Sequence, residues 1–461
     1  MDFLSYDALA KGFADYIYDP ANGICYQDEE GNTYFTAYCE GNGNEMVTWG
    51  ILAVGDALMG TQSWGGKART FEKYFHPVHG LYTNTPGSTK TEYWYLLYVN
   101  TLAGAVYRSV FPDCENVKQK MITATESLSK MAISINHDFN DQGYDFVRGT
   151  PWTNKDIYRQ PDSIGGYAYN MLFAGIHGGR DDFIQEAASA LEKYTSFESN
   201  PWYEIPNGAT AVLAAAWLHK NGYEVNLEKT LDYIFDTKEG PLQAGQWNGK
   251  PVDGLMMGWR GDDREYAESS AYSMETLMPL PFILPAVKYE PSIGKRVAIH
   301  ALNAVTNFEL FYGNGIYQTR PDLSDAVPYE KLEKSRDGHS PAACGDFMGH
   351  RSVYGGGYLA WIATIMRPTG CGDMPAWDLS LTDWLATGNP EPTFMLYNQS
   401  KKEKTVKFAP HKVWQKKRPD LYPGGVLKGN VLSGQVHGEI EDGQINLIIP
   451  PESVVVITLK P

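Results

Sequence analysis

The sequence predicts a mainly α-helical fold: an (α/α)6 toroid of helical hairpins, followed by a small antiparallel β-domain. Two observations carry this prediction. Helices that are apolar nearly all round alternate with helices that carry a charged face, and the chain changes to short strand-like segments near its C-terminus. A helix that is apolar on every side has to be surrounded by protein, whereas one with a charged face borders water. The 461 residues suffice for one large toroidal domain and a small module.

Six segments are apolar, small or aromatic on nearly every side, and we expect them to form the inner ring: 46–60, 92–107, 164–179, 209–222, 273–287 and 353–366. The segments between them are amphipathic and fit the outer ring: 115–132, 181–194, 226–238 and 294–311. An irregular solenoid of helix pairs is the alternative, but the lengths of the repeats vary too much for it.

After Ala386–Pro392 the chain reads as short alternating segments separated by turn residues. We therefore predict two domains, a toroidal domain over residues 1–388 and a β-sandwich-like domain over residues 391–461. The second domain has few concentrated polar and aromatic motifs, so it is interpreted as a packing module.

Composition excludes several classes of function. The net charge of −16 argues against nucleic acid and anionic membranes as partners. The five cysteines form no CxxC pair and the ten histidines form no metal-binding motif, so neither a metal nor a cofactor is expected. The N-terminal residues 1–13 read as an amphipathic helix rather than a signal peptide, which favours a cytoplasmic location; a periplasmic or secreted protein with its signal removed is the alternative. The glycines at 355–357 lack a phosphate-loop pattern and fit a close helix crossing.

The segments that precede the six inner helices carry the polar chemistry. They are rich in carboxylates, aromatics, glycine and asparagine, and they span 36–45, 86–94, 156–167, 200–209, 258–269 and 337–358. In a toroid these segments converge at one end. The chain also holds 12 Trp, 30 Tyr and 18 Phe, and aromatic rings in such loops suit the C–H faces of sugars.

Cleavage of a glycosidic bond needs two carboxyl groups, one that donates a proton and one that activates water or attacks the sugar. The predicted catalytic residues are Asp263, with its neighbour Asp262 as an alternative, Asp162, and Glu92. Glu92 stands among three aromatic residues, which should raise its pKa and keep it protonated as an acid. The alternative is a glutamate in the first turn of a helix, favoured by the helix dipole. Further acidic candidates are Glu45, Glu204, Glu268 and Asp346.

Each acidic candidate also has a structural interpretation. Asp162 and Asn44 precede helices as N-cap residues do, and Asp262 with Glu265 has the spacing of a capping box. Capping does not explain why an arginine stands near the acid in both "YRQPD" and "WRGDD". Each arginine could hold a substrate carboxylate or a pair of hydroxyls. The predicted substrate-binding residues are Arg159, Arg260, Trp259, Tyr158, Tyr167, Glu45, Trp202, Asn207, His339, Asp346 and His350.

The whole pattern resembles the (α/α)6-barrel carbohydrate-active enzymes, the six-hairpin glycosidases and toroidal polysaccharide lyases. The six apolar helices carry the resemblance together with the C-terminal segments 394–408, 421–431 and 448–461. The resemblance lies at the level of architecture and implies a glycoside hydrolase acting on an oligosaccharide, with uronate-containing substrates included.

Three other functions stay open. A polysaccharide lyase would use a tyrosine and a histidine from the set Tyr158, Tyr167, Tyr354, His339 and His350. A dehydratase or isomerase would use the thiols of Cys39 and Cys344. A carbohydrate-binding protein without catalysis would have the aromatic residues but no opposed acids.

Overall fold

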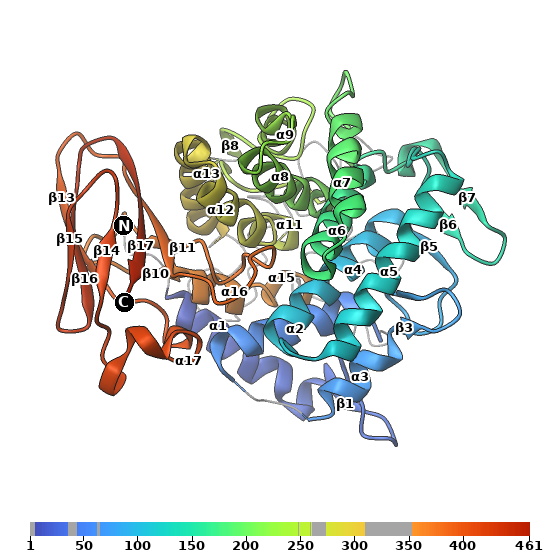
Figure 1. Ribbon diagram of the computed structural model, residues 1–461, viewed down its shortest axis with the longest axis horizontal. Helices are drawn as coiled ribbons and strands as arrows, with labels where there is room; N and C mark the ends of the chain where they lie inside the picture. The colour runs from blue at the N-terminus through green and yellow to red at the C-terminus, as the bar shows by residue number, and fades with distance from the viewer. Residues whose placement is uncertain are drawn as a thin grey trace.

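The computed structural model describes residues 5–35, 44–61, 65–247, 249–258, 260, 273–308 and 353–461 (Figure 1). Within these ranges, six inner helical positions pack side by side into a ring whose last member returns to the first, as the sequence predicted. The inner positions are α2 (Met46–Met59), α4 (Tyr93–Ser109), α6 (Ser163–Gly178), α8 (Ile205–Lys220), α11 (Ser273–Leu277) with α12 (Leu280–Tyr289), and α15 (Val353–Gly356) with α16 (Leu359–Ile365).

An outer layer of helices alternates with the inner ones along the chain: α1 (Tyr6–Tyr18), α3 (Lys67–Lys73), α5 (Glu115–Ser134), α7 (Asp181–Tyr194), α9 (Leu227–Ile234) and α13 (Gly294–Asn307). Helix α7 illustrates the outer type, because it buries one stripe formed by Phe183, Ala187, Ala190, Leu191 and Tyr194. Helix α8 illustrates the inner type, because every residue from Ile205 to Ala216 is buried. The two kinds of helix therefore occupy the two layers for the reason that their sequences indicate.

The fifth and sixth inner positions are each broken into two short helices, where the sequence predicted one continuous helix. Pro279 and Pro281 flank the start of α12, and proline cannot donate the backbone hydrogen bond that would continue α11. Between α15 and α16 lies Gly357, where an added Cβ would stand 2.5 Å from Cγ2 of Ile51 on α2. The predicted close helix crossing at the glycine triplet is thus present, at the contact that closes the ring.

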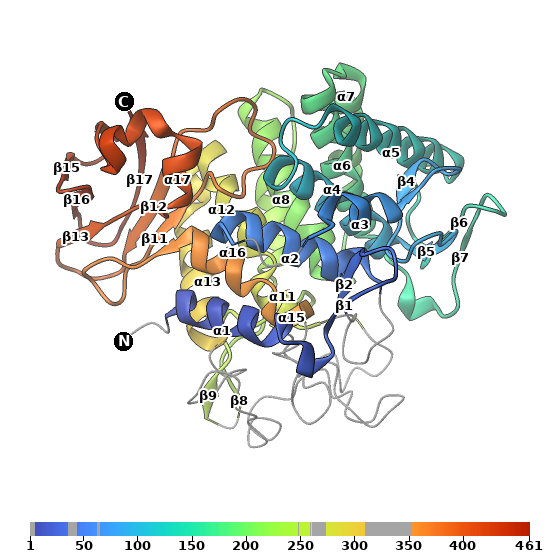
Figure 2. The same cartoon turned by 90° about the horizontal axis from the view of Figure 1, so that it is seen from below.

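The C-terminal strands form two antiparallel sheets beside α13 (Figure 2). One has the order β10-β11-β12-β17-β14 and the other β13-β16-β15. The strands are β10 (Met366–Arg367), β11 (Ala376–Asp378), β12 (Thr393–Asn398), β13 (Lys404–Phe408), β14 (Asn430–Leu432), β15 (Gly438–Glu441), β16 (Gln444–Ile449) and β17 (Ser453–Lys460). Since β10 and β11 precede residue 388, the boundary between 388 and 391 stays a prediction.

Strand β12 joins the two parts of the molecule. Its side chains alternate, with Phe394 and Leu396 in the core shared by the two sheets and Met395 and Tyr397 in the core of the toroid. A strand covered on both faces reads as a continuous apolar run, and every residue of β12 is buried. The β-domain is therefore fixed to the toroid by a shared hydrophobic layer.

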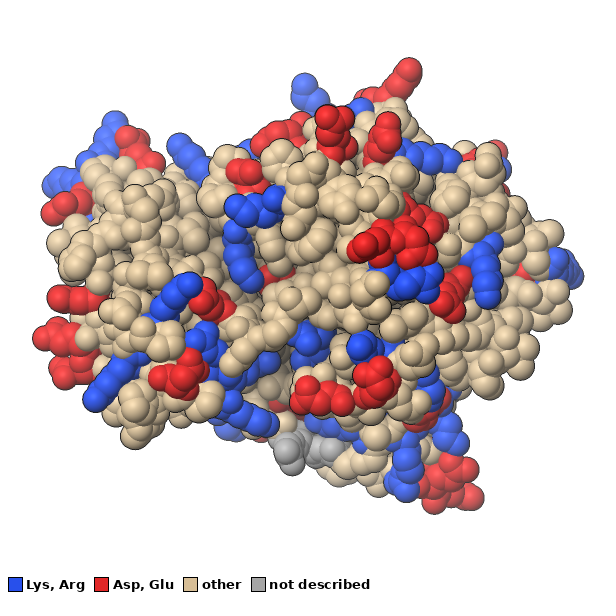
Figure 3. Space-filling view, in the orientation of Figure 1, with Lys and Arg blue, Asp and Glu red and all other residues tan. Residues whose placement is uncertain are grey.

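Short strands form small sheets in the loops of the toroid. Their strands are β1 (Cys25–Gln27), β2 (Thr33–Phe35), β3 (Phe75–His76), β4 (Leu81–Tyr82), β5 (Lys90–Glu92), β6 (Gly143–Asp145), β7 (Thr150–Trp152), β8 (Gln246–Trp247) and β9 (Lys250–Pro251). The face shown in Figure 3 carries acidic and basic side chains interspersed. No helix among the described residues has the length and apolar character needed to cross a membrane.

The crossing at Gly357 yields a test of the ring. Gly357→Ala should lower the free energy of unfolding by about 1–3 kcal/mol, because the new methyl group collides with Ile51 and with the carbonyl oxygen of Val353, also 2.5 Å away. Urea unfolding measures the change. Gly370→Ala is the control, since no atom lies within 4 Å of its added Cβ, and it should stay within about 0.5 kcal/mol of the parent. Equal stability of both variants would contradict the close crossing.

Candidate active site

Three of the inner helices begin directly after a glutamate. Glu45, Glu92 and Glu204 are the N-cap residues of α2, α4 and α8, and none of them makes a side-chain capping hydrogen bond. The residues that usually cap helices are Ser, Thr, Asp and Asn, whose short side chains reach the free N–H groups of the first turn. The three carboxyl groups are therefore free of the capping role.

The charges of the three carboxyl groups all act on Tyr95 in the first turn of α4. Burial raises the pKa of the Tyr95 phenol well above its usual value, and the nearby charges of Glu45, Glu204 and Glu92 raise it further. Charges act in this way only at short range. The starts of α2, α4 and α8 thus place their glutamates within electrostatic range of one phenol, and the convergence of all six predicted segments stays a prediction.

Glu45 is held by neutral hydrogen-bond donors. Burial raises its pKa, and hydrogen bonds from Tyr354 and Asn84 act in the opposite direction. The Tyr354 hydroxyl donates to Oε2 of Glu45 and lies 3.3 Å from the Tyr95 hydroxyl. Because a phenol can donate or accept, this contact can also accommodate a protonated Glu45.

Glu92 is held differently, by two glutamine amides. Nε2 of Gln142 donates to one carboxylate oxygen and Nε2 of Gln160 to the other, both at 2.9 Å. Each amide has a fixed orientation, because its own carbonyl oxygen accepts a backbone N–H, from Asn154 at 3.0 Å and from Trp94 at 2.8 Å. Burial raises the pKa of Glu92, in the direction predicted, while the two amides favour the ionised form.

Asp162 is fully buried and contacts the start of α8. Its Oδ2 accepts the backbone N–H groups of Tyr203 at 2.9 Å and Glu204 at 3.2 Å. Burial raises its pKa to about 7. Its predicted catalytic role stays a prediction, and this geometry gives it a positioning role, because it fixes the backbone that carries Glu204.

Several predicted substrate-binding residues contact other parts of the protein. The Tyr167 hydroxyl donates to Glu186 on the outer helix α7. Nδ2 of Asn207 donates to Oγ of Ser163 at 3.2 Å, between α6 and α8. Trp202 is buried, with its backbone N–H bonded to Oδ1 of Asn200 at 3.0 Å. These contacts stabilise the ring.

The two predicted arginines differ in their surroundings. Arg159 pairs with Asp141 at 3.0 Å and Asp156 at 3.1 Å, so its guanidinium is already neutralised. Arg260 contacts the segment that precedes α8: its backbone N–H donates to the carbonyl of Tyr203 at 2.9 Å, and its Nη1 donates to the carbonyl of Asn200 at 3.4 Å.

Tyr158 is half-buried, and the ammonium of Lys155 lies 5.4 Å from the centre of its ring. The remaining candidates fall outside the described residues: Trp259, Asp262, Asp263, Glu268, His339, Cys39, Cys344, Asp346 and His350.

The structure adds residues that sequence reasoning missed. Tyr95, Asn84, Gln142 and Gln160 contact or surround the glutamates, and Glu275 accepts the backbone N–H of Ile205 at 3.0 Å. A glutamate inside the otherwise apolar run at 273–287 was a readable signal for Glu275. The glutamines carried no such signal, because they lie far from Glu92 in sequence.

In the ranges that the structure describes, no group of three or more His, Cys, Asp and Glu side chains is placed to hold a metal ion. Cys25, Cys114 and Cys371 are free thiols.

Comparison with known proteins gives matches to solved structures only. No protein-family model matches the chain, and no curated protein matches it. It is similar to a sugar epimerase from a ruminal bacterium (11% identity, 77% of this chain and 98% of that one, TM-score 0.44). It is also similar to the cellobiose 2-epimerase of Spirochaeta thermophila DSM 6192 (14%, 78% and 95%, 0.42). A third match is a GH127 β-L-arabinofuranosidase from Geobacillus stearothermophilus T6 (11%, 98% and 76%, 0.38). TM-scores below 0.5 are too low to support an inference about the activity of this chain.

Asp162 yields a stability test. Asp162→Ala leaves two buried N–H groups unpaired and should cost about 2–5 kcal/mol, whereas Asp162→Asn keeps an acceptor oxygen and should cost far less. In the parent, the folded state holds a proton up to a pKa of about 7 while the unfolded state loses it near 3.8. Stability should therefore fall as pH rises from 4 to 7, by at most about 4 kcal/mol.

Urea unfolding at several pH values measures this slope, which should be much smaller in Asp162→Asn. An unchanged slope would show that another group titrates. Loss of activity in a folded Asp162→Asn variant would instead favour the catalytic role predicted from sequence.

Proposed function

We propose that this protein is a glycoside hydrolase that acts on an oligosaccharide through the carboxyl groups of Glu45 and Glu92. The observation that carries the proposal is the placement of these two groups at the ends of adjacent inner helices, around one phenol, with both pKa values raised by burial. Carboxyl pairs whose environments differ are the usual basis of acid and base roles in glycosidases.

Glu45 is the proposed proton donor. Its phenol partner can accept as well as donate a hydrogen bond, so the protonated carboxyl is tolerated at neutral pH. In the reaction its proton passes to the glycosidic oxygen as the bond from that oxygen to the anomeric carbon breaks. The leaving sugar departs as a neutral alcohol and Glu45 is left ionised.

Glu92 is the proposed base. Two amides with fixed orientation donate to its oxygens and stabilise the carboxylate. It takes one proton from a water molecule whose oxygen bonds to the anomeric carbon, so the sum is one glycoside and one water giving two hydroxyl-bearing products. This assignment reverses the sequence-based expectation that Glu92 is kept protonated by its aromatic neighbours.

Residues around the pair supply contacts for a sugar. The rings of Trp94 and Tyr95 are in contact, with centroids 3.8 Å apart, and Tyr95 is partly exposed. Aromatic rings of this kind stack on the C–H faces of sugars. The carboxyl group of Glu204 can accept sugar hydroxyls, and Arg260 is the proposed partner of a uronate carboxylate where the substrate has one.

The lyase alternative has less support in the described residues. Burial and the charge of Glu45 raise the pKa of Tyr354 well above its usual value, so its hydroxyl is a poor base. The thiol-dependent alternative rests on Cys39 and Cys344, which lie outside the described residues, and the following experiments distinguish all the alternatives.

A panel of oligosaccharides, scored for new reducing ends and for unsaturated products, should show reducing ends only. With the best substrate, Glu45→Gln and Glu92→Gln should each lower kcat by about a thousandfold, because each loses one partner of the acid–base pair. Glu115→Gln at the exposed start of α5 is the matched control and should retain activity.

Aryl glycosides separate the two roles. A leaving group of low pKa needs no proton, so Glu45→Gln should regain much of its activity on a dinitrophenyl glycoside while Glu92→Gln should not. The reverse result would exchange the roles. Unsaturated products would establish a lyase, and binding without turnover would establish a binding protein.

The hydrogen bonds from Gln142 and Gln160 to Glu92 yield a pH prediction. Gln160→Glu keeps an acceptor for the Trp94 N–H but places a second carboxyl against Glu92, which raises the pKa of the pair. The acidic limb of the kcat/KM profile should move to higher pH by about one unit or more, because the base must be ionised. The exposed change Gln119→Glu on α5 should leave the profile unchanged. An unmoved limb would exclude Glu92 as the base.

A further inference from the structure

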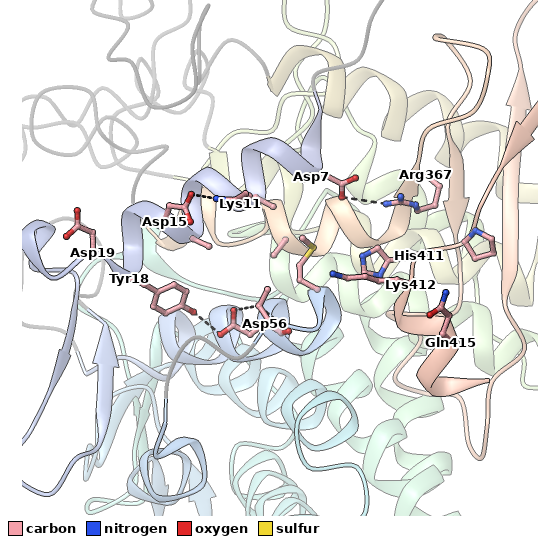
Figure 4. Close-up of a pocket in the computed structure, with 16 residues that line it drawn as sticks. Asp7, Lys11, Asp15, Tyr18, Asp19, Asp56, Arg367, His411, Lys412 and Gln415 are labelled. Carbon is pink, nitrogen blue, oxygen red and sulfur yellow. Dashed lines mark hydrogen bonds and ion pairs between the residues drawn. The ribbon is translucent and has the colours of Figure 1, made fainter. Parts of the chain in front are cut away.

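A second cavity lies at the opposite end of the inner helices from the glutamates. It has a volume of about 1100 Å³ and is lined by the C-terminal end of α2, by Ala360 of α16, by α1, and by residues 410–415 of the β-domain (Figure 4). Asp56, which lines it, follows Glu45 by eleven residues of α2, a rise of roughly 16 Å along the helix. The cavity is therefore separate from the proposed active site.

Basic side chains and hydrogen-bond donors lie at one end of this cavity: Arg367, His411 and Lys412 (Figure 4). The first comes from β10 of the toroid-facing sheet and the other two from the segment before α17 (Val413–Lys417). Their proximity is also seen in the charges of Arg367 and Lys412, which together with burial lower the pKa of His411 to about 4.

Only some of the N–H groups of the Arg367 guanidinium have partners within the described residues. Its Nη1 donates to the carbonyl oxygen of Ala363 at the end of α16, at 2.9 Å, and forms a longer ion pair with Oδ1 of Asp7, at 3.6 Å. In the described part of the chain its Nε–H has no acceptor. Buried guanidinium N–H groups normally have an acceptor, so the Nε–H of Arg367 is an exception.

His411 presents a fixed donor at the same end. It is 5% exposed, and its Nδ1 accepts the backbone N–H of Val413 at 3.3 Å. The ring proton of the neutral imidazole must then be on Nε2. Lys412 is exposed and has no carboxylate at ion-pair distance within the described ranges.

The aspartates of the cavity are engaged within the protein, and the Asp7 carboxylate is the ion-pair partner of Arg367. Asp56 accepts hydrogen bonds from Tyr18 and Thr61, both at 2.8 Å, and Asp15 pairs with Lys11 at 2.5 Å. Asp19 accepts the backbone N–H of Ala21 at 2.9 Å. The cavity is also lined by apolar side chains, which we call the apolar strip: Ala10, Ala14, Met59, Ala360 and Pro410.

We propose that this cavity binds a small organic carboxylate, whose anionic group meets Arg367, His411 and Lys412 and whose body lies on the apolar strip. The planar guanidinium suits a carboxylate, and a neutral imidazole N–H adds a directed donor. Because the cavity is walled by both α1 and residues 410–415, the ligand would contact the toroid and the β-domain together. A sugar carboxylate and an aryl carboxylate share this chemistry.

Isothermal titration calorimetry with two matched pairs tests the proposal: glucuronate against methyl glucoside, and phenylacetate against phenylacetamide. At least one carboxylate should bind about tenfold or more tightly than its neutral counterpart, and the pair that shows the difference identifies the source. Equal affinity within both pairs, or no binding of either carboxylate at millimolar concentration, would overturn the proposal.

Variants test which residues bind the carboxylate. Arg367→Gln should lower the affinity for the carboxylate by about tenfold or more. Lys412→Gln, at an exposed position, should lower this affinity less and leave the fold intact. Arg296→Gln, an exposed arginine on α13 paired with Glu228 and Asp232, is the matched control and should bind as the parent does. Glu92→Gln should also bind normally. Unchanged affinity in both Arg367→Gln and Lys412→Gln would refute the assignment, and loss in Glu92→Gln would place the ligand in the active site.

Discussion

The ring of inner helices imposes the constraint on which the rest of the molecule depends. Each inner helix is buried on every side, so charged side chains can stand only at its ends. Polar groups within the ring are neutral and paired, as with Asn170, whose amide donates to the carbonyl of Leu97 at 3.1 Å and to Thr101 at 3.2 Å. The chemistry of the protein is therefore concentrated at the two ends of the ring, and burial near those ends raises the pKa of Glu45 and Glu92.

Much of the architecture could be predicted because it depends on local pattern. Apolar character on every side identified the inner helices, and the amphipathic stripe identified α5, α7, α9 and α13. The breaks between α11 and α12 and between α15 and α16 were missed, although Pro279 and Gly357 stand there. A single proline or glycine indicates a break only when the packing around it is known, and the close neighbour of Gly357 comes from α2.

The candidate site was less predictable, because its key contacts join distant parts of the chain. Asp162 was considered as a cap for its own helix or as a catalytic acid, yet it receives the N–H groups that begin α8, some forty residues later. The glutamines that hold Glu92 lie 50 and 68 residues from it. One signal was present in the sequence: a glutamate directly before an apolar helix, at Glu45, Glu92 and Glu204. Glutamate is an uncommon N-cap, so its repetition indicates a purpose other than capping.

The two ends of the ring also differ in how rigidly they are held. At the glutamate end, Glu92 is fixed by amides that are themselves fixed by backbone N–H groups, so the carboxylate is placed before any substrate arrives. At the other end, Arg367 and His411 retain donor capacity and face a cavity walled by two different parts of the fold. Helix α2 runs between the two ends, and both Gly50 and Gly55 on it lie against neighbouring inner helices at Cβ distances of 3.0–3.3 Å. A ligand in the second cavity would therefore act on a helix that cannot shift independently of the ring. Its expected effect is to stabilise the contact between toroid and β-domain, with the geometry of Glu45 unchanged.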